Sequence, residues 1–158
     1  MKQFILLLTI LVSSLLHAQT KIYERNSTFS GDVLCNLKDG KMYQKTSSFS
    51  GDILFNFNGN KIYQGNSTFS GDVLFTVSNG RVYKGNSSFS GDIVATIKDN
   101  KVYQGNSTFS GDVLVTWRDG KVYSGNSNFS GDILFSMDAF VTTDEFVAIL
   151  YYLRFIFE

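Results

Sequence analysis

Six aspartates recur at twenty-residue intervals and are the first candidates for chemistry in this sequence: Asp32, Asp52, Asp72, Asp92, Asp112 and Asp132. A ring of carboxylates could bind calcium, which takes about six to eight oxygen ligands. A pair of carboxylates could hydrolyse glycosides. One aspartate in each repeat supplies too few ligands unless the copies converge. We therefore expect no metal and no cofactor, and a glycoside hydrolase is the least favoured function.

Nucleophilic catalysis has even less support. The only histidine is His17 and the only cysteine is Cys35. A Ser–His or Cys–His pair needs a histidine beside the nucleophile, and His17 lies in a leader that we expect to be removed. Cys35 falls at a core position of its repeat, where a free cysteine acts as a small apolar residue. We therefore expect a protein that is not an enzyme.

Residues 1–18 have the features of a secretory signal peptide. Lys2 supplies a short positive region, Phe4 to Leu16 an apolar region, and Ala18 a small residue at the expected cleavage point. No cysteine follows that point to carry a lipid anchor. The expected location is therefore periplasmic or secreted. The 14 basic and 14 acidic residues balance, so nucleic acid is not an expected partner; we expect a monomer whose ligand or partner is unknown, with lipid and protein as candidates.

Residues 19–138 contain six copies of a twenty-residue repeat, such as KIYQGNSTFSGDVLFTVSNG from residue 61. Two-residue pairs such as Asn79-Gly80 separate a longer β-rich run from a shorter one and predict tight β-hairpins. Five hairpins are complete, and a strand is left over at each end. Pairing Lys21–Tyr23 with Gly131–Phe135 would close a ring of six.

The hairpin turn fixes which residues share a face of the sheet. With a turn at Asn79-Gly80, Val77 faces Val82 and Phe75 faces Lys84, and strict alternation puts Val73 on the same apolar face. This face is the expected core. The opposite face carries Leu74, Thr76 and Tyr83, and its mixed character predicts partial contact with solvent.

Between hairpins the sequence GNSxFSGD predicts a connector, because its residues bond their own backbone or accept unusual backbone angles. We expect Phe69 to anchor the connector in the core, Gly71 to allow a conformation or close approach denied to other residues, and Asp72 to accept backbone N–H groups. The residues assigned this structural role are Tyr63, Phe69, Ser70, Gly71, Asp72, Phe89, Gly91, Asp92, Phe109, Gly111 and Asp112.

Residues 139–158 break the repeat and predict a hydrophobic helix. Thr142 or Thr143 can cap it, and Asp144 and Glu145 suit its first turn. A helix apolar on all sides must be buried, and about 15 residues are too few to span a bilayer. Twelve strands would form a barrel about 12 Å in radius, which such a helix can fill. We expect residues 143–157 to plug the barrel.

The expected fold is all-β with one helix: a closed barrel of about six hairpins, or about 12 antiparallel strands, around the C-terminal helix. The alternative is an open β-solenoid. The barrel favours an exported, non-catalytic structural or binding module whose ligand is a lipid or another apolar molecule. The solenoid favours a surface that binds glycan or ice through repeated Ser, Thr and Asn side chains.

The repeated pattern DGKVYxGNSxFSGDVL, seen from Asp119 to Leu134, resembles the β-flower repeat proteins of exported bacterial origin. This resemblance covers residues 21–138 and implies a ring of β-hairpins. The expected barrel around a hydrophobic helix is also similar to the tubby and phospholipid-scramblase architecture. Neither resemblance implies catalytic residues.

Overall fold

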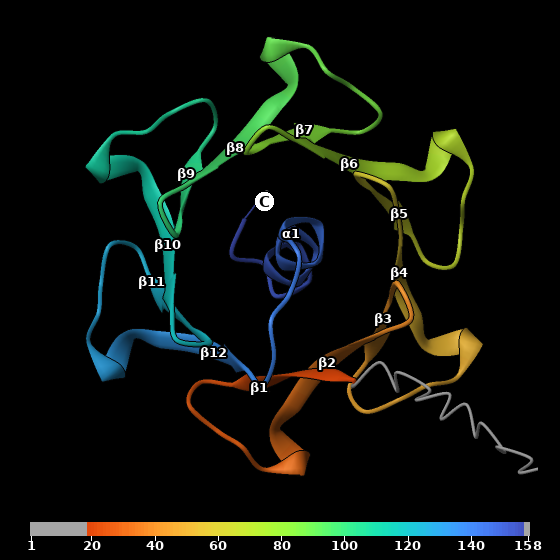
Figure 1. Cartoon of the computed structure of the whole chain (residues 1–158), viewed down its shortest axis with the longest axis vertical. Helices are drawn as coiled ribbons and strands as arrows, with labels where there is room; N and C mark the ends of the chain where they lie inside the picture. The colour runs from red at the N-terminus through yellow and green to blue at the C-terminus, as the bar shows by residue number, and fades with distance from the viewer. Residues whose placement is uncertain (1–18, 157–158) are drawn as a thin grey trace, which may run out of the picture.

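The computed structural model describes residues 19–156 and shows a closed barrel of twelve antiparallel strands around one α-helix (Figure 1). Each strand pairs with its neighbours in sequence, and β1 pairs with β12. The expected signal peptide, residues 1–18, lies outside the described residues and stays a prediction. The strands are β1 Thr20–Glu24, β2 Val33–Lys38, β3 Lys41–Gln44, β4 Ile53–Asn58, β5 Lys61–Gln64, β6 Val73–Ser78, β7 Arg81–Lys84, β8 Ile93–Lys98, β9 Lys101–Gln104, β10 Val113–Arg118, β11 Lys121–Ser124 and β12 Ile133–Met137.

The two leftover strands close the ring as the sequence predicted. Ile22 is opposite Met137, and Glu24 is opposite Phe135. Asp138 reinforces the junction, because its Oδ1 accepts the Lys21 backbone N–H at 2.8 Å. The six-fold closed barrel is confirmed, and the open solenoid is wrong. The extended surface that the solenoid would have offered to glycan or ice is therefore not a feature of this closed barrel.

The tight turns have the backbone that their residues suggested. In four of the five, both central residues have positive φ, as at Asn79 (50°) and Gly80 (70°). This is the pattern of type I′ turns. At Gly59-Asn60 only the glycine has positive φ, the pattern of a type II′ turn. Both types match the twist of the strands they join.

A β-bulge in every repeat overturns the expected strict alternation. Ile62 is opposite Phe75, whereas the next residue, Tyr63, is opposite Val73, so Leu74 is the extra residue on β6. Phe75 and Val77 belong to the core as expected. Leu74, which was assigned to the outer face, packs against that core, and Val73 is buried outside it. The hairpin register, with Val77 opposite Val82 and Phe75 opposite Lys84, is confirmed.

The outer face of the barrel is less solvated than expected because the connectors fold over it. Tyr63 and Thr76 are buried. The Thr76 hydroxyl donates to the Gly85 carbonyl at 2.8 Å, at the start of the following connector. In the first hairpin, the Asn36 side-chain amide donates to two connector carbonyls instead. Each connector is therefore bonded to the hairpin before it.

The C-terminal helix α1 (Thr143–Tyr152) runs inside the barrel. Thr142 is its N-cap and forms a capping box with Glu145. The helix ends earlier than the expected 157, because Arg154 has φ of 60° and the Phe155 N–H donates back to the Leu150 carbonyl at 2.9 Å. This is a Schellman-type ending. It turns Phe155 and Ile156 back toward the barrel wall.

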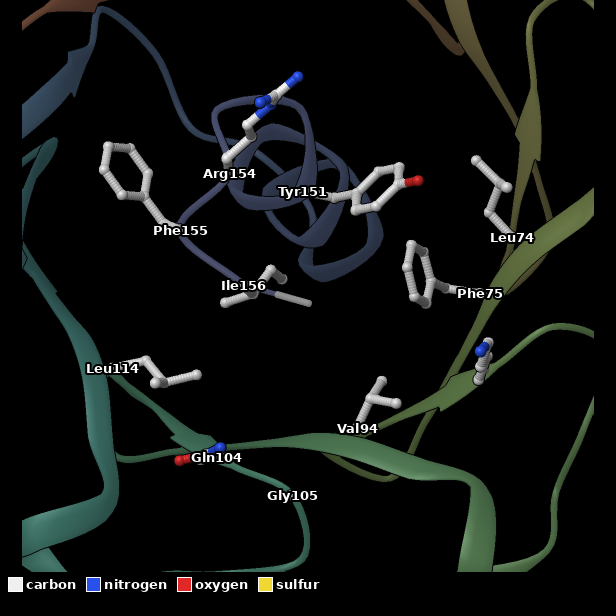
Figure 2. Close-up of a pocket in the computed structure, with 11 residues that line it drawn as sticks. Leu74, Phe75, Val94, Gln104, Gly105, Leu114, Tyr151, Arg154, Phe155 and Ile156 are labelled. Atoms are coloured by element: carbon white, nitrogen blue, oxygen red, sulfur yellow. The ribbon is translucent and has the colours of Figure 1, made fainter. Parts of the chain in front are cut away.

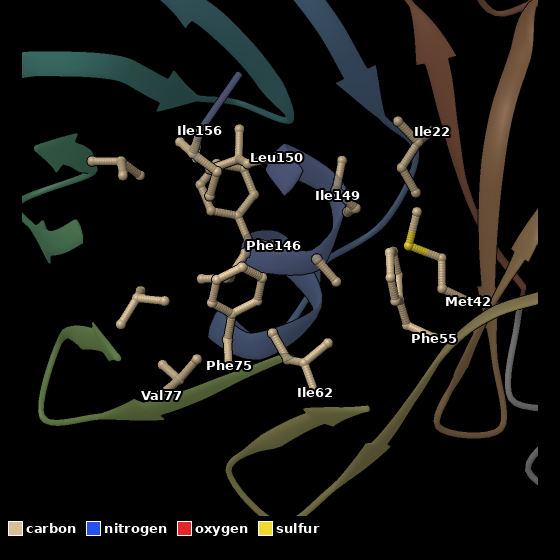
Figure 3. Packing of buried hydrophobic residues seen from close by; sticks show 14 of the residues in the cluster. Ile22, Met42, Phe55, Ile62, Phe75, Val77, Phe146, Ile149, Leu150 and Ile156 are labelled. Atoms are coloured by element: carbon tan, nitrogen blue, oxygen red, sulfur yellow. The ribbon is translucent and has the colours of Figure 1, made fainter. Parts of the chain in front are cut away.

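The core lies between α1 and the inner face of the strands (Figure 3). Phe146, Ile149 and Leu150 are buried on the helix and meet strand residues such as Met42 and Ile62. Among the described residues, no helix is long and apolar enough to span a membrane. The apolar side chains of α1 are instead buried inside the barrel of the same chain.

Candidate functional site: a cavity beside the internal helix

Up-and-down strand pairing divides the loops between two ends of the barrel. The tight turns lie at one end, which we call the tight-turn end. The six connectors, such as Gly65–Asp72, lie at the other, which we call the connector end, and they project outward around it (Figure 1). Ten of the eleven residues assigned a structural role by sequence are in connectors; the other, Tyr63, is buried beside one.

The connector phenylalanines do not anchor the core, contrary to expectation. The exposed fraction of Phe69 is 77%, and its five equivalents are 73–79% exposed. The phenylalanine precedes a 3-10 turn (Ser70–Asp72) in extended conformation. The adjoining bulge puts Leu74 against the core instead. Phe89 and Phe109 are exposed in the same way.

The expected roles of the invariant glycine and aspartate also need correction. A Cβ on Gly71 would meet nothing within 4 Å, and its φ is not in the left-handed region. Gly91 and Gly111 are equally unconstrained. The Asp72 carboxylate accepts the Ser67 hydroxyl at 2.5 Å, and not a backbone N–H. Asp92 and Asp112 make the same bond to Ser87 and Ser107.

The six carboxylates stay apart, one on each connector (Figure 1). Within residues 19–156 no three His, Cys, Asp or Glu side chains are grouped so as to hold a metal ion. Among the described residues, the aspartates therefore do not gather into the calcium site considered from sequence. Each aspartate instead holds its own connector.

A cavity of about 810 Å³ lies between the C-terminal end of α1 and the barrel wall (Figure 2). Its wall is largely apolar. Leu74, Val94 and Leu114 contribute from three successive long strands, and Phe155 and Ile156 contribute from the chain after α1. Because these residues adjoin the connectors and the end of the helix, the cavity opens at the connector end.

The side chain at the inward position of the long strands differs in size between repeats. At the inward position of the long strands, Phe55 and Phe75 fill the space beside the helix and pack on the Tyr151 ring, with centroids 5.9 and 5.0 Å away. The next two repeats have Ala95 and Val115 at that position. The cavity is lined by Phe75 and by the bulge residues Leu74, Val94 and Leu114, and not by Ala95 or Val115.

Three polar side chains stand at the mouth of the cavity: Lys84, Gln104 and Arg154. Lys84 is opposite Phe75 in the ladder and so shares its inward face. Gln104 is opposite Ala95 in the same way. Lys84 and Arg154 are exposed, and no carboxylate within residues 19–156 forms an ion pair with either. Within the described residues, the mouth therefore carries two positive charges above an apolar interior.

Arg154 occupies a backbone position that favours glycine. Its φ of 60° lies in the left-handed region, where a residue with a side chain costs about 1–2 kcal/mol. Glycine is the usual residue at this point of a Schellman-type ending. The arginine side chain lies beside the cavity at this turn.

Sequence reasoning missed this cavity and the two cations at its mouth. The size variation among Phe75 equivalents was visible, but it indicated only complementary packing. Lys84 did stand out as the one cation in a set of inward strand ends that otherwise reads Glu24, Gln44, Gln64, Gln104 and Ser124. Lys84 becomes informative only when the C-terminal end of α1 is known to lie beside the same cavity.

A family model described as six-fold β-flower protein matches residues 20–150. The chain belongs to this family. The match covers the whole barrel and most of α1, so the helix-filled ring is part of the family pattern. No curated protein and no solved structure gives a significant match. Membership of the β-flower family shows that the chain is a small module built from repeats, and the match names no ligand.

Cys35 of this β-flower barrel is buried against the core, at the ring position where Phe75 stands in its own repeat. Burial raises the pKa of its thiol to about 12. The folded protein therefore keeps the thiol neutral at pH values where an exposed thiol ionises. This environment suits a packing residue and not a nucleophile.

The Cys35 thiol predicts a loss of stability in alkali. Its pKa rises from 9.0 to about 12 on folding, so between these values the unfolded chain binds fewer protons and the free energy of unfolding falls as pH rises. The fall should reach about 1.4 kcal/mol per pH unit. Cys35→Ala, which copies Ala95, should lack this component. Urea melts of both proteins from pH 7 to 11 test it, and parallel curves above pH 9 would contradict it.

Proposed function

We propose that this β-flower protein is a non-catalytic binding module that holds one apolar chain with an anionic head group. The observation that carries the proposal is the cavity beside α1, apolar within and bordered by Lys84 and Arg154. Its volume of about 810 Å³ is within the range of about 300–1,000 Å³ that is typical of small-molecule sites.

The ligand chemistry follows from the two parts of the cavity. Leu74, Val94 and Leu114 offer an apolar wall to a hydrocarbon chain, whose transfer from water is favourable by about 0.8 kcal/mol per CH₂. Lys84 and Arg154 can pair with a carboxylate at the mouth. A long-chain fatty acid combines both features. The expected signal peptide would export the module, and so place it where fatty acids pass between the cell envelope and the medium.

The test is titration of the full chain with cis-parinaric acid, a fatty acid whose fluorescence rises in apolar surroundings. Val94→Phe fills the cavity and should weaken binding more than about tenfold. Leu54→Phe is the matched control, because Leu54 is the equivalent bulge residue and lies away from this cavity. Binding that is equal in Val94→Phe and the parent would overturn the proposal.

The head-group contact has its own variants. Lys84→Gln installs the residue found at Gln104 and should weaken binding about fivefold, the value of one exposed ion pair. Arg154→Gly should weaken it similarly while raising the melting temperature, because glycine relieves the left-handed φ. The uncharged methyl ester should bind the parent and both variants equally. An ester that distinguishes them would contradict the assigned head-group site.

A further inference from the structure

The six connector phenylalanines are invariant although the fold does not use them. Core positions vary freely, as Phe75 and its equivalents Cys35 and Ala95 show. The exposed phenylalanine is present in all six repeats: Phe29, Phe49, Phe69, Phe89, Phe109 and Phe129. The glycine two residues later is also invariant, exposed and free of any backbone constraint. Residues kept at the surface without a role in packing point to contact with something outside the chain.

Each phenylalanine is held by a rigid, internally bonded loop. In the third repeat, the Phe69 N–H donates to the Ser67 hydroxyl oxygen at 3.1 Å, and the Asp72 N–H donates to the Phe69 carbonyl at 3.0 Å. The Ser67 hydroxyl donates to Asp72. The φ of the phenylalanine stays between −75° and −81° in all six connectors. Little backbone entropy is lost if such a residue makes a contact.

All six phenylalanines lie around the same end of the barrel as the cavity mouth. The connectors share one end because the strands alternate in direction. The bulge occurs at the same place in each repeat, so the six connectors leave the barrel at equivalent positions. The connectors project away from the centre of the barrel (Figure 1), and exposed serine and glycine residues lie beside each phenylalanine in the sequence. The rings therefore form a spaced circle and not one continuous apolar patch.

We propose that this circle of phenylalanines docks the connector end on the surface of an uncharged lipid layer. The inference rests on the proposed function, since docking would bring the cavity mouth against the source of its ligand. A fluid, flat surface can accept six separated rings at once, whereas a folded partner would need six matching pockets. Aromatic side chains are commonly found at the boundary between head groups and acyl chains.

Charge decides which lipid is favoured. Among residues 19–156, the connector end carries seven carboxylates, Glu24 and the six aspartates, against four cations: Arg25, Lys45, Lys84 and Arg154. Its net charge is therefore negative, and an anionic surface would repel it. The proposal commits to zwitterionic lipid such as phosphatidylcholine.

The test is co-flotation of the full chain with phosphatidylcholine vesicles. The parent should float with them, and replacing a third of the lipid with phosphatidylserine should weaken binding. Changing three alternate residues, Phe29, Phe69 and Phe109, to serine should weaken binding by about tenfold or more for each ring that inserts fully, and the six-serine variant should not float. Phe140→Ser is the matched control, because Phe140 is 90% exposed and borders the tight-turn end.

The outcomes separate docking from ligand binding. All variants should keep the parent's melting temperature, because the rings are exposed, and the six-serine variant should bind cis-parinaric acid in solution as the parent does. Flotation without acid binding would leave docking in place and overturn the proposed function. A parent that does not float, or that loses flotation equally in Phe140→Ser, would overturn docking. Dimerisation that depends on the phenylalanines, without flotation, would also overturn docking and would identify a second copy of the chain as the partner.

Discussion

Removing residues 142–158 should abolish cooperative unfolding of the barrel. The deleted segment contains Phe146, Val147, Ala148, Ile149 and Leu150, whose side chains are almost fully buried. Loss of a single large core side chain costs about 2–5 kcal/mol, whereas a whole domain is stable by about 5–15 kcal/mol. Losing all five at once exceeds that stability. The product should be molten or aggregated, with strand content retained and fixed packing lost.

Near-UV circular dichroism, dye binding and thermal melts of the truncated and full chains measure this effect. Thr142→Ala is the control, because it removes the N-cap side chain while leaving the apolar helix present. It should cost only about 1 kcal/mol and keep a sharp transition. A truncated chain that stays soluble and melts cooperatively would show that the barrel does not need its helix.

Gly80→Ala should destabilise the protein by about 1–3 kcal/mol, the usual cost of a strained backbone position. Gly80 has φ of 70°, and a Cβ there would lie 2.7 Å from the Ile97 carbonyl oxygen. Backbone crowds this site because the Ile97 N–H donates to the Gly80 carbonyl at 2.6 Å. The hairpin tip would have to move away from β8 to admit the methyl group.

Gly71→Ala is the matched control, since it makes the same change where a Cβ meets nothing. It should be neutral or stabilising by up to about 1 kcal/mol, because alanine restricts the unfolded chain. Gly80→Asn should fall between the two, as Asn100 holds the equivalent position with φ of 58°. Denaturant unfolding of the three variants compares them. Equal losses at Gly71 and Gly80 would refute the assignment of strain to the hairpin tip.

The overall ring could be predicted from sequence because its information is local and repeated. Pairs such as Asn79-Gly80 accept positive φ, which sets a two-residue turn and hence the register of Phe75 against Lys84. The unpaired first and last strands then allow one closure. The apolar stretch after Thr142 has nowhere to be buried except in the ring, and the structure places it there.

The candidate site could not be predicted, because it depends on contacts between distant residues. Strict alternation predicted that Val73 faces the core and Leu74 faces outward, whereas the β-bulge reverses the two residues. Phe69 was expected to anchor the connector in the core, yet its side chain is exposed and Leu74 packs against the core instead. Val94 and Leu114 came to line a cavity only when the end of α1 lay beside them.

The sequence by itself determined the period, the turns, the closure of the ring and the capped helix, because each depends on backbone preferences or alternation within about twenty residues. Only the tertiary structure decided that the connector phenylalanines face outward, that Lys84 and Arg154 meet at one mouth, and that the wall is hollow beside β8 and β10. These features arise from how side-chain volumes from different repeats fit around one helix, and no single repeat contains that information.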